Sequence, residues 1–221
     1  MILMMVLWRT RVDRPDAIHA CVVLCMVVTV WDERCDRQLY FLISYLAGSR
    51  NSLVVFKAHP LDSWADIRVE GETDASLKLP KSHGGVAGWY GSERGSFGLF
   101  EWSSGQQELG LASTMSSELL QMYKGTLILM PWVSLVELQG IPSQLTLYAD
   151  NQAAVLAAQR GWGKSCAFLG RAVGLRLSLL GSLVENQSLR IVWRASRYNV
   201  ADGLTKRLAR LALSAWRILI G

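Results

Sequence analysis

The stretch that decides the fold is LTLYADNQAAVLAA, from Leu145 to Ala158. In its first half, through Ala149, apolar residues alternate with threonine and tyrosine, which is the period-two pattern of a strand. After Asp150 the apolar residues recur at helical spacing, so we expect a helix with Asp150 or Asn151 as its N-cap. The stretch therefore predicts a carboxylate where a strand ends and a helix begins, and ligands bind at such strand ends in open α/β sheets.

The sequence around this stretch predicts an α/β domain over residues 61–221. The expected order is three strands, a helix, a strand, helices, a strand and a helix. We place the strands at 67–74, 86–90, 97–102, 145–149 and 189–193, and later helices at 166–185 and 199–211. Gly71 is a candidate bulge in the first strand. Ser113 or Thr114 can cap the first helix, and Pro131 is expected to kink or divide it because proline lacks a backbone donor.

Residues 1–60 are expected to form a separate, helix-rich segment. Pro15 suits the first turn of a helix, and the apolar run 17–31 is read as a buried helix. At 15 residues that run is shorter than the roughly 20 needed to span a bilayer, so no membrane partner is expected. A short strand is expected at 53–57, and the domain boundary falls near residue 60.

The composition is that of a globular protein, with 51% hydrophobic and 19% charged residues in 221, which excludes a disordered chain. Residues 1–150 carry 12 lysines and arginines against 16 acidic residues, whereas residues 151–221 carry 11 against two. A basic region beside carboxylates suggests a polyanionic partner, although a basic solvated surface explains the charge alone. The four cysteines form neither a zinc pattern nor a disulfide framework, so we expect an intracellular, reducing location.

Four carboxylates occupy telling places in the predicted domain: Asp74 in its first strand, Glu118 early in its first helix, Asp150 at a strand end and Asp202 at the start of the last helix. Each has an ordinary explanation as a cap, a turn former or a solvated helix residue. Together they are the hard oxygen ligands that Mg²⁺ prefers. Two such ions about 4 Å apart can activate a water and stabilise the leaving oxygen of a phosphodiester.

The same residues carry a family resemblance. The segments TDAS (73–76), LASTMSSELL (111–120), YADNQAAVLAA (148–158) and NVADGLTK (199–206) resemble the ribonuclease H domain of copia-type retrotransposon polyproteins. Upstream, RPDA (14–17) and CDRQLYFLISYLAGSRNSLVVF (35–56) resemble the end of the copia-type reverse transcriptase. The acids come in the order Asp, Glu, Asp, Asp, whereas the related integrases place their glutamate last. No YxDD-like motif is present, which excludes a complete reverse transcriptase.

The resemblance implies a ribonuclease H-like mixed five-stranded sheet flanked by helices and preceded by a small helical segment. It implies a metal-dependent endonuclease that hydrolyses the RNA strand of RNA–DNA hybrids, with two Mg²⁺ ions, or Mn²⁺ in their place. Asp74 would bridge both ions, Glu118 and Asp150 would complete one site, and Asp202 the other. The rest of a reverse transcriptase polyprotein is a second expected partner.

Residues in the basic part are candidates for contacts with the nucleic acid. We expect polar contacts in the minor groove and contacts with phosphates from Asn151, Gln152, Lys164, Arg194 and Lys206. Trp162 and Trp193 are either core residues or stacking partners for bases. An alternative function stays open, because no histidine lies near Asp202. The chain would then be a catalytically inactive retroelement remnant that only binds nucleic acid.

Overall fold

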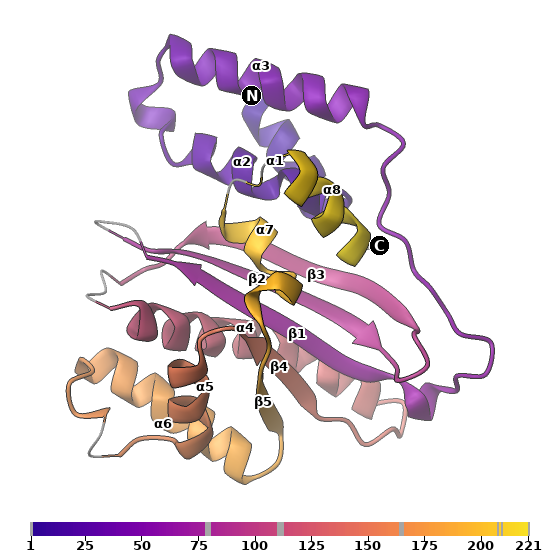
Figure 1. Cartoon of the computed structure of the whole chain (residues 1–221), viewed down its shortest axis with the longest axis vertical. Coiled ribbons are helices and arrows are strands. Elements are labelled where there is room, and N and C mark those ends of the chain that lie inside the picture. The colour runs from indigo at the N-terminus through magenta and orange to yellow at the C-terminus, as the bar shows by residue number, and fades with distance from the viewer. Residues whose placement is uncertain are drawn as a thin grey trace.

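The computed structural model describes residues 2–77, 81–109, 113–163, 166–206, 208 and 210–220. At its centre lies a five-stranded sheet in the order β3-β2-β1-β4-β5 (Figure 1). β2 runs antiparallel to both β1 and β3, whereas β4 runs parallel to both β1 and β5. The strands are Arg68–Ser76, His83–Gly91, Phe97–Gln106, Leu145–Ala149 and Leu189–Trp193. The α/β class with a mixed five-stranded sheet flanked by helices is confirmed.

The stretch Leu145 to Ala158 folds as predicted. Leu145, Leu147 and Ala149 are fully buried in β4, which has a parallel neighbour on each side. The helix α5 (Gln152–Arg160) follows, and the Asn151 side chain accepts a hydrogen bond from the Ala154 N–H at 3.0 Å. Because Asn151 is the cap, the Asp150 carboxylate is free to face another partner.

One face of the sheet is covered by α4 (Thr114–Glu137), α5 and α6 (Arg171–Glu185), which lie below the sheet in Figure 1. Ser113 caps α4 by accepting the Ser116 N–H. Of the two effects expected of Pro131, a kink or a division, the division does not occur, since α4 is one continuous helix. Proline at 131 leaves the carbonyl of residue 127 without its helical donor. Leu127, the residue that carries this carbonyl, is half-exposed.

Within the described residues, α4 is the one helix long and apolar enough to cross a membrane by length and composition. Half of its apolar window is buried inside the protein, where the helix packs against β1, β2 and β4. The apolar character of α4 is therefore that of a core helix.

The prediction of a bulge at Gly71 is wrong. The pairing of β1 with β2 runs without a break through Gly71 and Gly88, and the irregularity lies instead between β2 and β3 at Gly88 and Trp89. A side chain at position 71 would place its Cβ 2.2 Å from Cδ1 of Leu129 on α4. Gly71 is thus explained by the close approach of α4 to the sheet.

The opposite face of the sheet is covered by α2 (Pro15–Cys25), α7 (Asp202–Thr205) and α8 (Arg210–Leu219), above the sheet in Figure 1. The single last helix predicted at 199–211 is wrong, because the chain leaves α7 after Thr205 and returns as α8. The return is fixed by Trp216, whose Nε1 donates to the Val200 carbonyl at 2.6 Å. Trp216 also packs so closely on Gly203 that a Cβ there would lie 2.3 Å from its ring.

The first 60 residues are mainly helical, with α1 (Ile2–Val12), α2 and α3 (Glu33–Gly48). The predicted helix at 17–31 is α2, which ends at Cys25, and Pro15 stands in its first turn as expected. No strand forms at 53–57, where only Lys57 makes an isolated bridge to Phe97. Short 3-10 turns lie at Val28–Val30, Trp64–Asp66 and Ser196–Tyr198.

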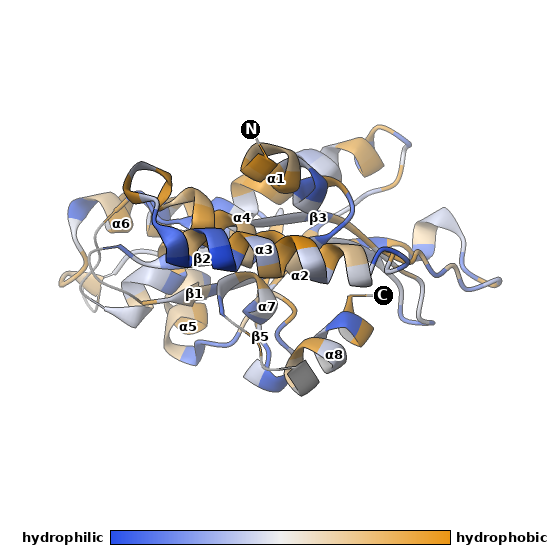
Figure 2. Cartoon of the chain, turned by 90° about the horizontal axis from the view of Figure 1, so that it is seen from above, coloured by the Kyte–Doolittle hydropathy of each residue, from blue (hydrophilic) through white to orange (hydrophobic). Residues whose placement is uncertain are grey.

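The N-terminal helices share a core with the sheet across the expected boundary near residue 60. Ile18 of α2 is 1% exposed in a cluster with Leu99, Trp102 and Trp216. The Trp102 Nε1 donates to the Thr10 carbonyl at 2.8 Å, which fastens α1 to β3. Figure 2 shows α1 largely in the hydrophobic colour, whereas α3 carries both hydrophilic and hydrophobic residues.

Candidate active site

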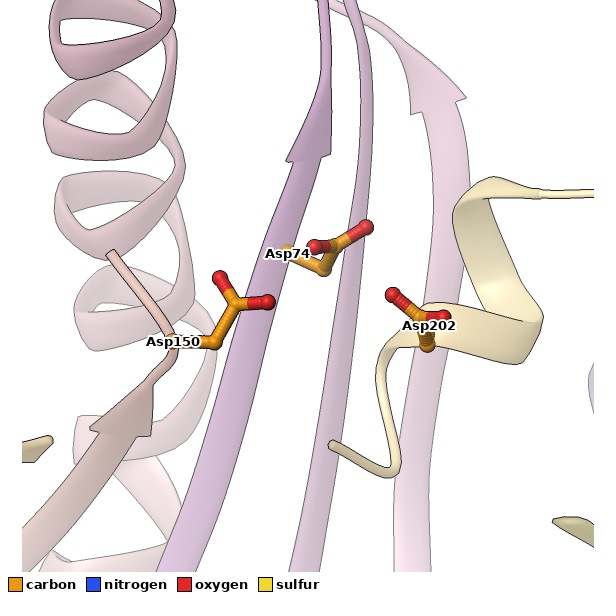
Figure 3. Close-up of side chains that lie close together, drawn as sticks. All are labelled: Asp74, Asp150 and Asp202. Carbon is orange, nitrogen blue, oxygen red and sulfur yellow. The ribbon is translucent and has the colours of Figure 1, made fainter. Parts of the chain in front are cut away.

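Three of the four predicted carboxylates meet above the sheet. Asp74 points from β1, Asp150 follows the last residue of β4, and Asp202 is the first residue of α7 (Figure 3). One oxygen of each lies within 4.8 Å of the others. Residues that are 52 to 128 positions apart in the chain therefore form one acidic cluster.

Asp74 is the buried member of the cluster, with 2% of its surface exposed. The Thr205 hydroxyl donates to its Oδ2, and the Lys206 Nζ lies 3.7 Å from the same oxygen. Burial raises the pKa of Asp74, and the Asp202 and Asp150 charges add to this, although Thr205 and Lys206 act the other way. Without further positive charge, ionised Asp74 is thus held in an unfavourable environment.

Asp150 and Asp202 are partly exposed, and each is held by one side-chain contact. The Ser196 hydroxyl donates to Oδ2 of Asp150 at 2.6 Å. The indole N–H of Trp193, half-exposed at the end of β5, donates to the backbone carbonyl of Asp150 at 2.9 Å. Asp202 accepts a hydrogen bond from Lys206 one turn later. These contacts leave carboxylate oxygens facing the centre of the cluster (Figure 3).

Glu118, the fourth predicted carboxylate, reaches the site from α4 on the other side of the sheet and is not part of the 4.8 Å cluster. It is 3% exposed, and its Oε2 has no hydrogen-bond partner among the described residues. Burial, and then the charges of Asp74 and Asp150, raise the pKa of Glu118 to about 9. Its carboxyl group therefore lies within electrostatic reach of the cluster.

The predicted nucleic-acid contacts fall into different environments. Lys206 is exposed and contacts the acidic cluster, and Gln152 is exposed two residues after Asp150, whereas the Asn151 oxygen is used as a helix cap. Arg194 is only partly exposed and lies over the Tyr148 ring, 3.5 Å from its centroid. Lys164 lies outside the described residues. Of the two candidate stacking residues, Trp162 packs against Gly174 and Trp193 makes the bond to Asp150.

Sequence reasoning missed Glu72, a fully buried carboxylate two residues before Asp74. Burial raises the pKa of Glu72 to about 7, although Arg194 and the Val200 N–H lower it. The signal was present in the first strand, because period-two alternation places Glu72 and Asp74 on one face. Asp74 belongs to the TDAS motif (73–76), whereas Glu72 lies just before it and belongs to no motif.

The donor set fits divalent cations. Asp74, Asp150 and Asp202 supply hard carboxylate oxygens at close range, and Glu118 adds a buried oxygen without a partner. Burial raises the pKa values of Asp74 and Glu118, and the charges of neighbouring carboxylates raise them further. Among the described residues, Lys206 is the positively charged side chain that contacts the cluster. A bound divalent cation would reduce the repulsion that remains between the carboxylates.

No protein-family model and no curated protein matches this chain. Among solved structures, ribonuclease H1 of Halobacterium salinarum is 18% identical, with a TM-score of 0.41 and coverage of 67% of this chain and 98% of that one. LC11-RNase H1 in complex with RNA/DNA hybrid is 13% identical, with a TM-score of 0.44 and coverage of 62% and 93%. The PFV RNase H domain is 11% identical, with a TM-score of 0.39 and coverage of 68% and 95%.

Proposed function

We propose that this chain is a metal-dependent endonuclease that hydrolyses the RNA strand of RNA–DNA hybrids, and that it derives from a copia-type retroelement. The observation that carries the proposal is the convergence of Asp74, Asp150 and Asp202, with oxygens within 4.8 Å, next to buried Glu118. Carboxylates clustered in this way are unfavourable in a protein without a cationic partner. The chain holds them in place with Thr205 and Ser196, which indicates a use for the cluster.

In this proposal the four carboxylates hold two Mg²⁺ ions, which Mn²⁺ can replace. Bound dications supply positive charge beside the scissile phosphate and make a neighbouring water more acidic. Ser196 and Thr205 keep the Asp150 and Asp74 carboxylates in orientation by donating one hydrogen bond to each. The products are a 5′-phosphate and a 3′-hydroxyl end.

The substrate class follows from charge and from the residues near the cluster. The region 151–221 has 11 basic against two acidic residues, which favours binding of a phosphate backbone. Exposed Lys206 is hydrogen-bonded to Asp202 of the cluster, and Asn151 and exposed Gln152 directly follow Asp150 in the chain. We assign to them contacts with phosphates and with the 2′-hydroxyls that distinguish RNA in the wide minor groove of a hybrid.

The direct test is cleavage of a hybrid labelled on either strand in the presence of Mg²⁺. We expect cleavage of the labelled RNA strand only. Asp150→Asn should reduce the rate at least about 100-fold, because a charge that holds the cation is lost. Asp150 is partly exposed, so this variant should fold. Unchanged cleavage by Asp150→Asn would contradict the site assignment, and cleavage of neither strand by the parent chain would contradict the nuclease proposal.

A second candidate function is binding of nucleic acid without turnover. The Lys206 ammonium group is bonded to Asp202 and lies 3.7 Å from Asp74, so it already compensates part of the acidic cluster. Burial lowers the pKa of Lys206, but Asp202 and Asp74 raise it more, which keeps the amine charged. Tight hybrid binding that is independent of Mg²⁺, without cleavage, would favour this second function.

A further inference from the structure

Glu72 joins segments that carry different members of the acidic cluster. It lies in β1 on the same face as Asp74 and is fully buried. Its Oε2 accepts a hydrogen bond from the backbone N–H of Val200 at 2.7 Å. Val200 lies two residues before Asp202, so one buried side chain connects the strand of Asp74 to the start of α7.

The same carboxylate oxygen of Glu72 also holds Arg194, whose Nη1 lies 3.6 Å away. Arg194 directly follows β5, and its backbone N–H donates to the Ala149 carbonyl at 2.9 Å, next to Asp150. Glu72 therefore contacts the segment 194–202, which runs from the end of β5 to α7, at its first residue Arg194 and near its other end at Val200.

Arg194 is itself fixed by aromatic rings. Its guanidinium carbon lies 3.5 Å from the centroid of the Tyr148 ring and 5.6 Å from that of Trp89. These two rings are nearly parallel, at an angle of 6° and with centroids 6.2 Å apart. Because aromatic faces attract guanidinium groups, Arg194 is a rigid partner for Glu72. It reaches across β4 toward β1, and this contact explains why it is only partly exposed.

The other oxygen of Glu72, Oε1, has no hydrogen-bond partner among the described residues. A fully buried carboxylate with an unpartnered oxygen costs stability. An apolar residue of similar size would fill the space at a lower cost in stability. The presence of an acid at this position is therefore explained by the contacts of its Oε2. That oxygen has two contacts, and both are to the segment that ends at Asp202.

We propose that Glu72 is a positioning residue, which fastens the segment 194–202 to β1 and thereby sets the distance of Asp202 from Asp74 for divalent-cation binding. This inference rests on the proposed function, because it assigns Glu72 a role toward the same cations. Glu72 itself does not belong to the cluster of Asp74, Asp150 and Asp202.

The test compares variants of Glu72 by two readouts on the full chain: Mn²⁺ affinity by calorimetry without nucleic acid, and hydrogen exchange of the Val200 amide. Glu72→Ala removes the acceptor, so Val200 exchange should accelerate and the Mn²⁺ Kd should rise about tenfold or more. Glu72→Gln keeps an acceptor oxygen and should stay within about threefold of the parent Kd. Glu72→Asp withdraws the carboxylate by one methylene and should resemble Glu72→Ala, which provides a second variant if the alanine protein does not fold.

Glu70→Gln is the matched control. Glu70 lies on the same strand and face, but it accepts its hydrogen bonds from Trp89 and Tyr148 and makes no hydrogen bond or ion pair to the described segment 194–202. Its variant should keep the parent Mn²⁺ Kd and Val200 exchange. If Glu72→Ala or Glu72→Asp folds and keeps the parent Mn²⁺ Kd and the parent Val200 exchange, the role of Glu72 is overturned. The proposed function is not affected by that result. A parent chain that binds no Mn²⁺ would instead overturn the proposed function.

Discussion

Glu118 has its pKa raised first by burial and then by the charges of Asp74 and Asp150 in the acidic cluster. It is buried, its Oε2 lacks a partner, and its pKa of about 9 means that it is protonated at neutral pH in the metal-free protein. Binding a dication would reverse this, because positive charge favours the ionised form. Cation binding at this site should therefore release a proton.

This pKa shift predicts a pH-dependent stability in the presence of EDTA. The unfolded chain loses the Glu118 proton near its ordinary pKa of 4.5, whereas the folded chain keeps it until about 9. Between these values the folded state binds more protons, so stability falls as pH rises, by up to about 1.4 kcal/mol per pH unit for one proton. Urea unfolding at pH 6 to 9 should show this fall in the parent chain.

Glu118→Gln provides the comparison for this pH effect. Glutamine does not titrate, so its stability should decline less over the same range. A residual decline is expected, since burial also raises the pKa of Glu72 to about 7. If the two proteins lose stability in parallel from pH 6 to 9, Glu118 is not the group responsible.

Among the elements, α4 and β1 must approach closely for Glu118 to reach Asp74. The approach is made possible by glycines: a Cβ at Gly125 would lie 2.5 Å from Cγ2 of Thr73, and one at Gly71 would meet Leu129. Two elements that carry predicted site residues are thus in contact through positions without side chains.

Gly125→Ala should destabilise the protein by about 1–3 kcal/mol, because overpacking outweighs the gain in helix propensity. The matched control is Gly48→Ala at the end of α3, where a Cβ would meet nothing within 4 Å. That control should be neutral or slightly stabilising. Chemical denaturation of both variants measures the difference, and equal stabilities would refute the close packing of α4 on β1.

Sequence predicted the elements whose signals are local. The strand at 145–149 could be predicted from the alternation of apolar and polar residues alone. The helix cap could be narrowed to Asp150 or Asn151 from their side-chain types, and the structure shows that it is Asn151. The division considered at Pro131 and the single helix expected at 199–211 are not found, for tertiary reasons. Packing of α4 against β1, β2 and β4 outweighs the one hydrogen bond lost at Pro131, and the docking of Trp216 decides where α7 ends.

The candidate site was predictable only in part. The four acids were identified from their motifs, but the convergence of Asp74, Asp150 and Asp202 is a property of the tertiary structure. Glu72 has no motif, and its partners Val200 and Arg194 lie more than 120 residues away. No local pattern shows that Arg194 turns toward Glu72 and the Tyr148 ring rather than toward solvent.

At the scale of the whole molecule, the N-terminal helices cover the sheet face that carries the acidic cluster. Ile18 of α2 packs with Trp102 of β3 and Trp216 of α8, and His19 contacts His83 of β2 at 3.2 Å between ring nitrogens. His83 forms a hydrogen bond with the Ser104 hydroxyl, and this hydroxyl donates a hydrogen bond to the Leu204 carbonyl in α7. A chain of contacts thus links α2 to the helix of Asp202.

Ile18→Ala should cost about 2–5 kcal/mol and lower the stability of the whole chain in one transition, since it leaves a cavity in the shared core. Ile43→Ala on α3, where the side chain is 38% exposed, is the matched control and should cost less than about 1 kcal/mol. Tryptophan fluorescence and circular dichroism would follow unfolding. An Ile18→Ala protein in which only the N-terminal helices melt early would indicate two independent domains.

The central claim is that the acidic cluster binds divalent cations, and calorimetric titration of the metal-free chain with Mn²⁺ tests it most directly. We expect saturable binding in the parent chain and at least about tenfold weaker binding in Asp74→Asn and Asp202→Asn. The same titration in two buffers of different ionisation enthalpy should detect proton release from Glu118. Parent-level Mn²⁺ binding in Asp74→Asn and Asp202→Asn, or no binding by the parent, would contradict the account.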